Sequence, residues 1–487
     1  MSDLHVDVII VGAGLSGIGA GYHLQKNCPG KNYLILEARE QMGGTWDLFK
    51  YPGIRSDSDM HTLGYKFKPW LAKKAIAEGP AILEYINETA RENNISKNIR
   101  YRHRVSKASW SSEKALWTIC VQPGDDQPDI RYTCKYLLMC AGYYQYKEGF
   151  TPEFPGREQF AGKLIHPQLW PEDLDYKNKK IVIVGSGATA VTLMPVLAEQ
   201  AEHVTMLQRS PTYMMSRPFE DKLANFLRKI MPEKWAYAVT RWKNITRGDW
   251  FYSRTRTKPD KVKEMIMKAL RKELDADCDI DKHFTPSYNP WDQRMCLVPD
   301  GDLFVSLNSG KSSIVTDQID TFTPTGIKLQ SGEELEADII VTATGLNMVQ
   351  MGEAEFEVDG KLIDFSKTWT YRGLMYSGVP NLVNTFGYIN ASWTLGADLT
   401  AENFCRMINH MESDGYNQVT PTLREEDQDM VPRPWIDDFS AGYMQRVMPL
   451  FPKQGDKAPW LNTQDYKKDK KLRGEAKFDD GALIFSE

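Results

Sequence analysis

Three features of this 487-residue sequence predict an α/β fold in which two Rossmann-like dinucleotide-binding domains are nested. The first is an apolar, β-branched segment at 6–11 that runs into a glycine-rich turn and a helix-like segment. The second is a repeat of this pattern at 180–199. The third is a pair of later apolar segments, 136–142 and 337–345, that end in glycine and resemble strands re-entering the sheets. Strands alternating with helices are typical of parallel sheets.

The first glycine turn, Gly12 to Gly17, has the flanking strands and helix that a dinucleotide fingerprint requires. Gly12 allows the tight turn, Gly14 lets a pyrophosphate approach the backbone, and Gly17 lets the helix pack on the strand. Glu37 ends the next strand, where a carboxylate can accept hydrogen bonds from both ribose hydroxyls. Because its charge repels a 2′-phosphate, we expect this domain to bind FAD or NAD rather than NADP.

The second glycine turn follows the predicted strand at 180–184 and opens a predicted helix. The next strand ends in a cation, Arg209, and a hydroxyl, Ser210, where the first domain has an acid. A guanidinium can pair with a 2′-phosphate through two hydrogen bonds, so this domain is expected to prefer NADPH over NADH; the alternative for Arg209 is an ordinary surface arginine. The turn residues expected to contact the coenzyme are Gly185, Ser186, Gly187, Ala188, Thr189, Ala190 and Val191.

Residues 219–285 are rich in Lys, Arg, Met, Trp and Leu at helical spacing, which predicts a helical insert that covers the active site. The spacing is carried by Phe226, Ile230, Trp235, Ala238 and Trp242, and the Trp and Met residues of the insert are expected to form core rather than to contact a cofactor. The charged segment 467–477 is predicted to be a solvated, mobile surface element. The predicted division of the chain is 1–145 FAD-binding domain, 146–175 linker, 176–218 and 286–335 NADP-binding domain, 219–285 helical insert, 336–431 second part of the FAD-binding domain, and 432–487 C-terminal region.

The composition argues against nucleic-acid binding, membrane spans and a metal site. The net charge of −5 argues against nucleic-acid binding, and no apolar run approaches the ~18 residues that span a membrane. The apolar N-terminus lacks a preceding basic region, so a buried strand explains it better than a signal peptide. The seven cysteines form no CxxC pair and have no metal-ligand spacing, which favours reduced thiols, no metal site and a cytoplasmic protein.

Two further motifs lie near the turns. The segment 160–171 has the pattern FxGxxxHxxxWP, carried by Phe160, Gly162, His166 and Trp170. It resembles the fingerprint of the type I Baeyer–Villiger monooxygenases, which are flavoproteins related to the flavin-containing monooxygenases. The loop 43–57 also matches that family's longer signature, through Gly44, Trp46, Tyr51-Pro52-Gly53 and Asp57. Segment 42–70 is most similar to the subgroup that includes the bacterial ethionamide-activating monooxygenase.

The resemblance implies an activity. Such enzymes reduce FAD with NADPH, react the flavin with O2, and hold a C4a-peroxyflavin that attacks a ketone to give an ester or lactone, with sulfoxidation of thioethers as a second activity. The family's active-site arginine corresponds to Arg294, and Asp57 corresponds to the carboxylate that holds it. An arginine suits this task because it cannot give up its proton to the peroxide. Without the resemblance, Arg294 would be read as a structural ion pair.

The resemblance also implies further contacts and one departure. Flavin contacts are implied for Ser16, Gly44, Thr45, Trp46, Asp47, Leu48, Arg55, Ser56, Asp57 and Val105. Trp393 is expected to open a helix that points at the flavin ring, His166 to position domains rather than act as a general base, and Trp170 to pack. Many members carry lysine before the active-site arginine, and this chain has Gln293, which leaves Arg209 with more of the NADP phosphate binding.

Three other functions can be weighed against this one. A flavin-containing monooxygenase would oxygenate N or S atoms with little ketone activity and would not need Arg294. A disulfide reductase shares the fold plan but needs a redox CxxC or CxxxxC pair, which the sequence lacks. A flavin-binding electron-transfer protein would not need the second glycine turn with Arg209. The favoured partners are therefore NADPH, O2 and a small ketone or thioether.

Overall fold

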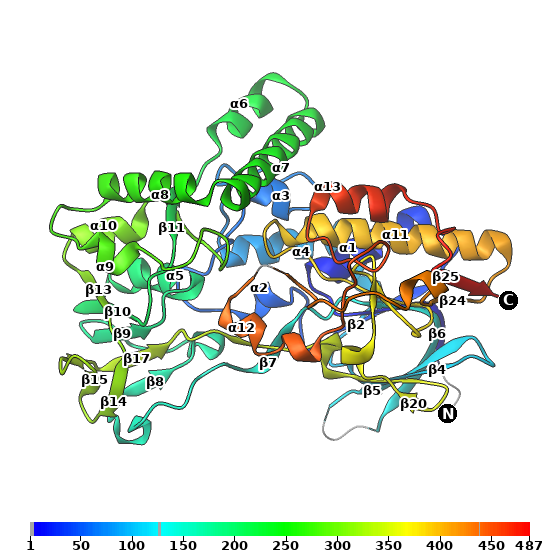
Figure 1. The fold of residues 1–487 in the computed structure, drawn as a ribbon, viewed down its shortest axis with the longest axis horizontal. Coiled ribbons are helices and arrows are strands. Elements are labelled where there is room, and N and C mark those ends of the chain that lie inside the picture. Colours follow the sequence, from blue (N-terminus) through cyan, green and yellow to red (C-terminus); the bar gives the residue numbers. More distant parts are fainter. Residues whose placement is uncertain (1–3, 125–127, 438) are drawn as a thin grey trace.

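Two sheets, each built around one of the glycine turns, form the two ends of the molecule in the computed structural model (Figure 1). The structure describes residues 4–124, 128–437 and 439–487. Both ends of the described chain lie at the first sheet, while the second sheet is built from the middle of the chain. The predicted α/β fold with two Rossmann-like domains is confirmed.

The first sheet has a parallel centre with an antiparallel extension. Its order is β20-β19-β4-β5-β6-β1-β2-β3, and β23 pairs with the carboxyl end of β6. In β1, Val8, Ile9 and Ile10 are fully buried, because other elements cover both faces of the sheet. The strands are β1 Leu4–Val11, β2 Tyr33–Leu36, β3 Ile99–Arg100, β4 Arg104–Ser111, β5 Leu116–Gln122, β6 Ile130–Met139, β19 Glu355–Val358, β20 Lys361–Leu362 and β23 Leu382–Asn384.

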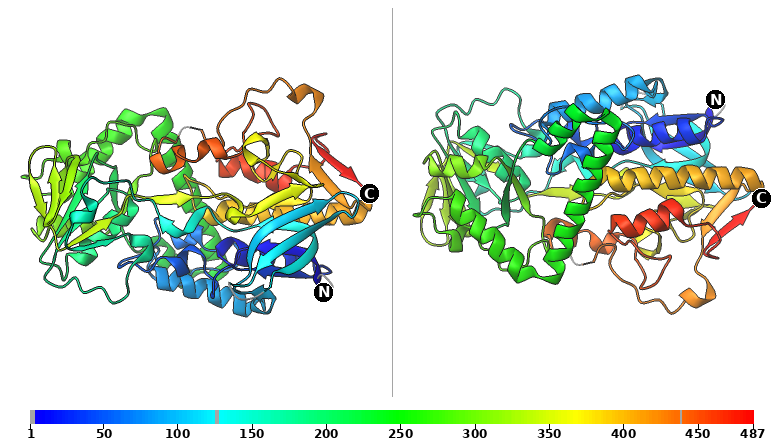
Figure 2. Two further views of the ribbon diagram at one scale, coloured as in Figure 1. Left: turned by 90° about the horizontal axis from the view of Figure 1, so that it is seen from below. Right: turned by 90° about the horizontal axis from the view of Figure 1, so that it is seen from above.

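Helices cover the upper face of this sheet (Figure 2). α1 (Leu15–Asn27) follows the first glycine turn and packs between α4 (Gly79–Glu92) and α11 (Trp393–Asp414). The inner side of α11 is almost wholly buried, and its first residue is Trp393. A helix from late in the sequence therefore begins beside the first glycine turn.

The second sheet has the order β13-β10-β9-β17-β8 and is wholly parallel. Its strands are β8 Lys163–Ile165, β9 Lys180–Val184, β10 His203–Gln208, β13 Ser312–Thr316 and β17 Ile339–Thr342, and its helices are α5 Ala188–Leu197 and α10 Asp302–Asn308. The small sheet β14-β15-β16 lies beside it, with strands Ile319–Thr323, Gly326–Leu329 and Glu334–Glu336.

One strand joins a different sheet from the one that the predicted division of the chain gives it. That division places β17 in the second part of the FAD-binding domain, which begins at 336. Instead Ile339 to Thr342 pair with β9 on one side, and β8 lies on the other. All four β17 residues are buried, so the strand needs cover on both faces, and either sheet could have supplied it.

Two short strands connect the ends of the molecule. β7 (Tyr144–Gly149) leaves the first sheet, β18 (Leu346–Met348) returns from the second, and the two pair antiparallel. The fold is therefore joined by a paired double connection rather than by a single linker.

The predicted helical insert is present as α6 (Lys222–Ile230), α7 (Glu233–Thr257), α8 (Pro259–Glu273) and α9 (Ile280–Phe284). α6 and α7 form a hairpin that projects from the molecule (Figure 1). The expectation that the tryptophans of the insert form core is wrong for this hairpin, because Trp235 and Trp242 are exposed. The other positions that mark the helical spacing, Phe226, Ile230 and Ala238, are exposed as well.

The prediction for 467–477 is wrong in part. α13 (Tyr466–Asp469) continues into a helical turn at Lys470–Glu475 that packs on α11. Arg473 and Asp469 form a 3.0 Å ion pair in which both side chains are buried, and Asn403 of α11 donates to the Arg473 carbonyl. A buried pair of this kind needs its partners in place, so the segment is anchored on α11, while its lysines are exposed. In the described parts of the chain, no helix has the length and apolar character to span a membrane.

Candidate active site

The first glycine turn is closed by its neighbours. Gly12 has φ +103°, and a Cβ there would lie 2.6 Å from the Cys140 carbonyl oxygen. A Cβ on Gly17 would lie 1.9 Å from the Gly12 oxygen. Gly14 caps α1 without a side-chain hydrogen bond, so the first N–H groups of the helix are free for an anion. The turn therefore fits a pyrophosphate.

Glu37 lies directly below this turn. Its Oε2 accepts from the Ala13 N–H at 2.7 Å, and its Oε1 accepts from the Arg39 N–H at 2.9 Å. Burial raises the pKa of the Glu37 carboxyl, and the two N–H donors oppose that shift. Each carboxylate oxygen retains a lone pair. Ribose hydroxyls can therefore still donate to Glu37, as the sequence predicts for an FAD site.

The loop after Gly43 packs against the glycine turn. The Gly43 N–H donates to the Ala13 oxygen at 3.0 Å, and Gly14 and Gly44 face each other without side chains. The next residues form the short helix α2, Thr45–Leu48, which holds Trp46 half-buried. Asp47 is paired with Arg39 at 2.6 Å, which fixes this helix below the turn. Thr45, Trp46 and Leu48 thus follow a loop that packs on the first glycine turn.

Two residues of this loop, Arg55 and Ser56, have partners within the protein. Arg55 forms an ion pair with Asp302 at the start of α10 and is buried there. The Ser56 hydroxyl is buried and accepts from the Ala77 N–H at 3.1 Å. Val105 is buried in β4 opposite Val121. The structure therefore does not bring Arg55, Ser56 and Val105 together with the glycine turn by any described contact.

Trp393 links the last large helix to the first turn. Its Nε1–H donates to the Ser16 hydroxyl at 2.8 Å. Its ring stacks on Tyr143, with centroids 5.1 Å apart, and also contacts Phe386. The expected helix opening at Trp393 is therefore present, and Ser16 is held by it.

Arg294 and Asp57 form an ion pair across two loops that lie far apart in the sequence. Both side chains are only partly shielded, so the pair can face a ligand. The Asp57 carboxylate raises the pKa of Arg294 above its already high ordinary value, although burial acts in the opposite direction. The site therefore holds a positive charge that persists at every accessible pH.

Three tyrosines interact with this charge, and no sequence motif singles them out: Tyr143, Tyr144 and Tyr443. Burial raises the pKa of each phenol, and the Arg294 charge opposes that shift. The hydroxyls of Tyr143 and Tyr144 are 2.9 Å apart. Neutral phenols donate hydrogen bonds, so they add donors around Arg294. A signal existed for the first two, which follow the carboxyl end of β6, where ligands bind in α/β sheets.

The second glycine turn resembles the first. A Cβ on Gly185 would lie 2.3 Å from the Ala343 oxygen, whereas Gly187 faces open space. Gly187 caps α5 without a side-chain hydrogen bond, and the helix begins with Ala188, Thr189 and Ala190. The Ser186 hydroxyl lies 2.8 Å from that of Thr212, and Val191 is buried. This helix terminus therefore fits the pyrophosphate of a second dinucleotide.

Arg209 and Ser210 lie exposed at the end of β10. Among the residues that the structure describes, Arg209 has no ion-pair partner, whereas the preceding Gln208 is buried and donates to the His283 oxygen and to Thr316. An unpaired guanidinium at this offset from the turn is available for a 2′-phosphate. Gln293, next to Arg294, is half-buried and uncharged.

His166 lies where the double connection meets the second sheet. Its Nε2–H donates to the Gly345 oxygen at 3.0 Å, and its Nδ1 accepts from the Gln168 N–H. A Cβ on Gly149 would overlap the ring, so the imidazole presses on the last residue of β7. His166 thus contacts the end of β7 and the residue before β18, and no described contact joins it to Arg294. This agrees with the expected positioning role.

This contact leads to a prediction about pH. Burial lowers the pKa of His166 below its ordinary value of 6.5, so the unfolded chain binds the proton at higher pH than the folded one. The contribution of the neutral His166 ring to the free energy of unfolding is complete above pH 6.5. It is lost as the pH falls through the folded-state pKa. The amide of His166→Gln can donate to the same oxygen but does not titrate. We therefore expect the urea-unfolding midpoint to fall less in this variant than in the parent when the pH is lowered from about 7.5 to about 5.5. Identical pH dependence in both proteins would contradict this role.

The other residues of the FxGxxxHxxxWP motif pack against the second sheet and its neighbours. Phe160 joins the small core between the second sheet and β14–β15, and Trp170 packs on the core of the second sheet. A Cβ on Gly162 would lie 2.4 Å from the Asp338 oxygen, just before β17. The motif therefore fixes β8 and its flanks against β17.

The chain matches known proteins over nearly its whole length. Residues 75–267 match the family described as flavin-binding monooxygenase-like, and residues 10–72 match the NAD(P)-binding Rossmann-like domain. The FAD-containing monooxygenase EthA of Mycolicibacterium smegmatis is 52% identical over 483 residues, covering 99% of this chain and 97% of the relative. The probable FAD-binding monooxygenase AlmA of Acinetobacter baylyi is 46% identical, covering 99% and 96%.

Solved structures share the fold. The crystal structure of OTEMO in complex with FAD and NADP superposes with a TM-score of 0.77 at 19% identity, covering 100% of both chains. The oxidised steroid monooxygenase bound to NADP gives a TM-score of 0.76 at 20% identity, covering 99% of this chain and 100% of the other. At these identities the likeness concerns the fold.

Proposed function

Because this chain belongs to the FAD-containing monooxygenases that include EthA and uses FAD and NADPH, we propose that it inserts one oxygen atom next to a ketone carbonyl, giving an ester or lactone. The observation that carries the proposal is the ion pair between Arg294 and Asp57. Oxygenation of soft nucleophiles does not need a fixed cation beside the reacting oxygen, whereas attack on a carbonyl does.

The residues of this chain have separate tasks in the reaction. Bound FAD, reduced by NADPH, supplies the activation of O2. Arg294 keeps a positive charge beside the reacting oxygen and faces the oxyanion that develops on the ketone. It cannot act as an acid, because Asp57 raises its pKa further. Asp57 orients the guanidinium and prevents an unpaired charge when water is excluded.

The tyrosines complete the surroundings of this charge. Tyr143 stacks on Trp393, which holds Ser16 at the first glycine turn. The Tyr143 and Tyr144 hydroxyls are hydrogen-bonded to each other, and the charge of Arg294 opposes the rise in the pKa of both phenols. A neutral phenol can donate a hydrogen bond to a carbonyl oxygen without changing the charge of the site. We propose that this pair helps to orient the ketone.

The second glycine turn and Arg209 receive NADPH in this proposal. The first N–H groups of α5 take the pyrophosphate, and Arg209 takes the 2′-phosphate. We further propose the domain division given by the sequence, with the NADP-binding domain extended through β17, and a cytoplasmic location that suits seven free cysteines.

The alternative function is oxygenation at N or S with little ketone activity. The purified yellow holoenzyme should be offered linear, cyclic and aromatic ketones and, separately, thioethers and amines, while NADPH and O2 consumption are recorded. We expect ketones to raise both rates and to give esters or lactones, and thioethers to give sulfoxides. Rates that respond only to thioethers or amines would favour the alternative.

A further inference from the structure

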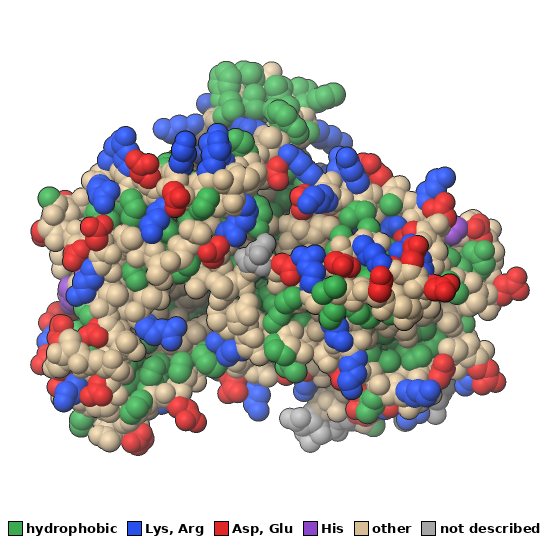
Figure 3. Space-filling view, viewed as in Figure 1, with side chains coloured by type: hydrophobic (Ala, Val, Ile, Leu, Met, Phe, Trp, Pro, Cys, Tyr) green, Lys and Arg blue, Asp and Glu red, His purple; other side chains and the backbone are tan. Residues whose placement is uncertain are grey.

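The tip of the α6–α7 hairpin carries an exposed apolar surface, which we call the apolar knob. Figure 3 shows it as a green protrusion at the top of the molecule, with basic side chains around its base. Its six members are Leu223 (48% exposed), Phe226 (55%), Ile230 (60%), Trp235 (69%), Val239 (40%) and Trp242 (69%). Single exposed apolar residues are ordinary, but six on adjoining helices mark an interaction site.

The knob is not a loosely packed core face. α7 is held from its other side, where Ala236, Tyr237, Thr240 and Arg241 are buried. Arg241 donates to the His61 and Gly64 oxygens at 2.9 Å each, and the Tyr237 hydroxyl donates to the Tyr65 oxygen at 2.9 Å. The polar anchors face inward and the tryptophans face outward, so the usual orientation of a surface helix is reversed.

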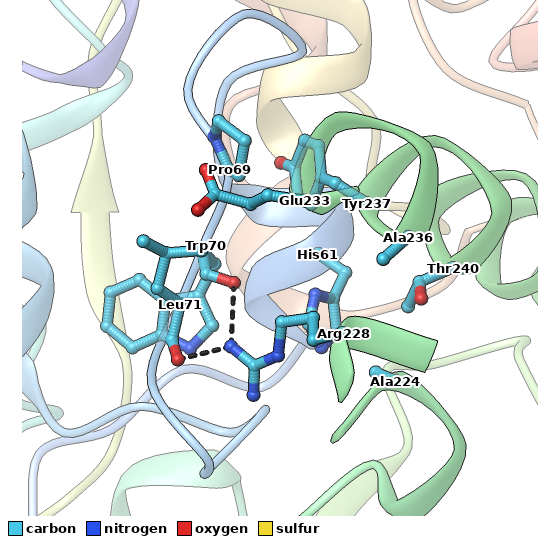
Figure 4. Close-up of a pocket in the computed structure, with 10 residues that line it drawn as sticks. All are labelled: His61, Pro69, Trp70, Leu71, Ala224, Arg228, Glu233, Ala236, Tyr237 and Thr240. Carbon is cyan, nitrogen blue, oxygen red and sulfur yellow. Dashed lines mark hydrogen bonds between the residues drawn. The ribbon is translucent and has the colours of Figure 1, made fainter. Parts of the chain in front are cut away.

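α6 is held in a similar way. Figure 4 shows Arg228 reaching across a narrow pocket to the carbonyl groups of Trp70 and Leu71. Arg228 also donates to the Ala72 oxygen and to Asn225. The apolar side chains Leu223, Phe226 and Ile230 lie on the outside of this anchored helix. The hairpin therefore presents the knob as a fixed structure.

The charge of the hairpin opposes that of the chain. Residues 222–247 contain seven Lys and Arg and a single acid, Glu233, in a protein with a net charge of −5. Lys222, Lys229 and Lys234 are exposed, and within the described residues none of them has an ion-pair partner. Three free ammonium groups thus lie next to the apolar knob, on the same protrusion.

We propose that the apolar knob and its three lysines dock this enzyme onto the surface of an anionic phospholipid bilayer. Tryptophan and phenylalanine favour the boundary between headgroups and acyl chains, and lysines beside them are drawn to anionic headgroups. A convex knob enters a fluid lipid surface without requiring a complementary groove. A two-fold contact between knobs would instead bring two basic hairpins together.

A flotation experiment tests this docking with the full-length holoenzyme. Vesicles of phosphatidylcholine alone are compared with vesicles that also contain phosphatidylglycerol. We expect binding to the anionic vesicles only, and weakening by added salt. Trp235→Ser/Trp242→Ser and, separately, Lys229→Gln/Lys234→Gln should each reduce the bound fraction at limiting lipid at least ~10-fold. NADPH oxidation in lipid-free buffer should stay unchanged, because neither pair contacts the glycine turns or Arg294.

Matched controls come from the same chain. Trp250→Ser removes a tryptophan that is 56% exposed on α7 but lies outside the knob, and it should bind as the parent does. Lys470→Gln/Lys471→Gln removes two exposed charges from the C-terminal region and should also have no effect. The proposal is wrong if the parent fails to float, if the controls weaken binding as much as the knob variants, or if the knob variants change only the oligomeric state.

Discussion

Arg294→Ala is expected to abolish ester formation, with a fall of about 10³-fold in kcat, while NADPH still reduces the flavin. The guanidinium is the only described charge paired with Asp57, and its removal leaves that carboxylate beside the reacting oxygen. A negative neighbour disfavours the oxyanion that develops on the ketone. NADPH consumption should then release hydrogen peroxide instead of ester. The measurements are gas-chromatographic ester yield, NADPH absorbance and peroxide release under the same conditions.

Two further variants separate the causes of this loss. Arg294→Lys keeps a positive charge but loses the planar fork, so it should retain part of the ester yield. Asp57→Asn keeps the shape of the partner and removes its charge, so it should lower the rate less than Arg294→Ala. An unchanged flavin absorbance spectrum in all three shows that the fold and FAD binding are intact. Ester formation by Arg294→Ala within tenfold of the parent would show that this role is wrong.

Arg209→Gln should raise the KM for NADPH by about 10- to 100-fold and leave the KM for NADH nearly unchanged. The range follows from the ~1.5–3 kcal/mol that a hydrogen bond to a charged group contributes, where 1.4 kcal/mol is tenfold. Arg209 is exposed at the end of β10 and has no competing ion pair among the described residues, so its loss should remove the phosphate contact alone. Steady-state flavin reduction with each coenzyme gives both constants.

Two comparisons make this result specific. Arg157→Gln removes another exposed arginine that has no ion pair in the described structure and lies toward the β8 edge, so it should change neither constant. Gln293→Lys introduces the cation that the family resemblance implies beside Arg294 and should lower the KM for NADPH. Equal increases for NADPH and NADH in Arg209→Gln would point to a disturbed turn rather than a lost phosphate contact.

Much of the fold could be predicted because its signals are local. A glycine turn that must pass a neighbouring carbonyl, as at Gly12 and Gly185, tolerates no side chain, so spacing in the sequence reveals it. Strand segments buried on both faces form continuous apolar runs, and such runs predict the buried ends of β1, β6 and β9. The acid at Glu37 and the cation at Arg209 stand at fixed offsets from their turns and could be assigned with them.

Other features of the fold and the site could not be predicted, because they depend on contacts between segments far apart in the sequence. β17 suited either sheet, and only its hydrogen-bonded register placed it beside β9. The tyrosines around Arg294 come from a strand end and from a distant C-terminal helix, so no spacing joins them. The segment 467–477 has the composition of a solvated tail, yet Arg473 forms a buried pair with Asp469.

The sequence by itself determined the two dinucleotide units and their charges, because backbone geometry and charge act over a few residues. Only the tertiary structure decided how Arg294 meets Asp57 and which side of α7 faces outward. A helical period gives two faces but does not say which one is covered. In this chain Arg241 and Tyr237 bind backbone carbonyls inside, and the tryptophans are left outside, because an unsatisfied buried carbonyl is more costly than an exposed ring.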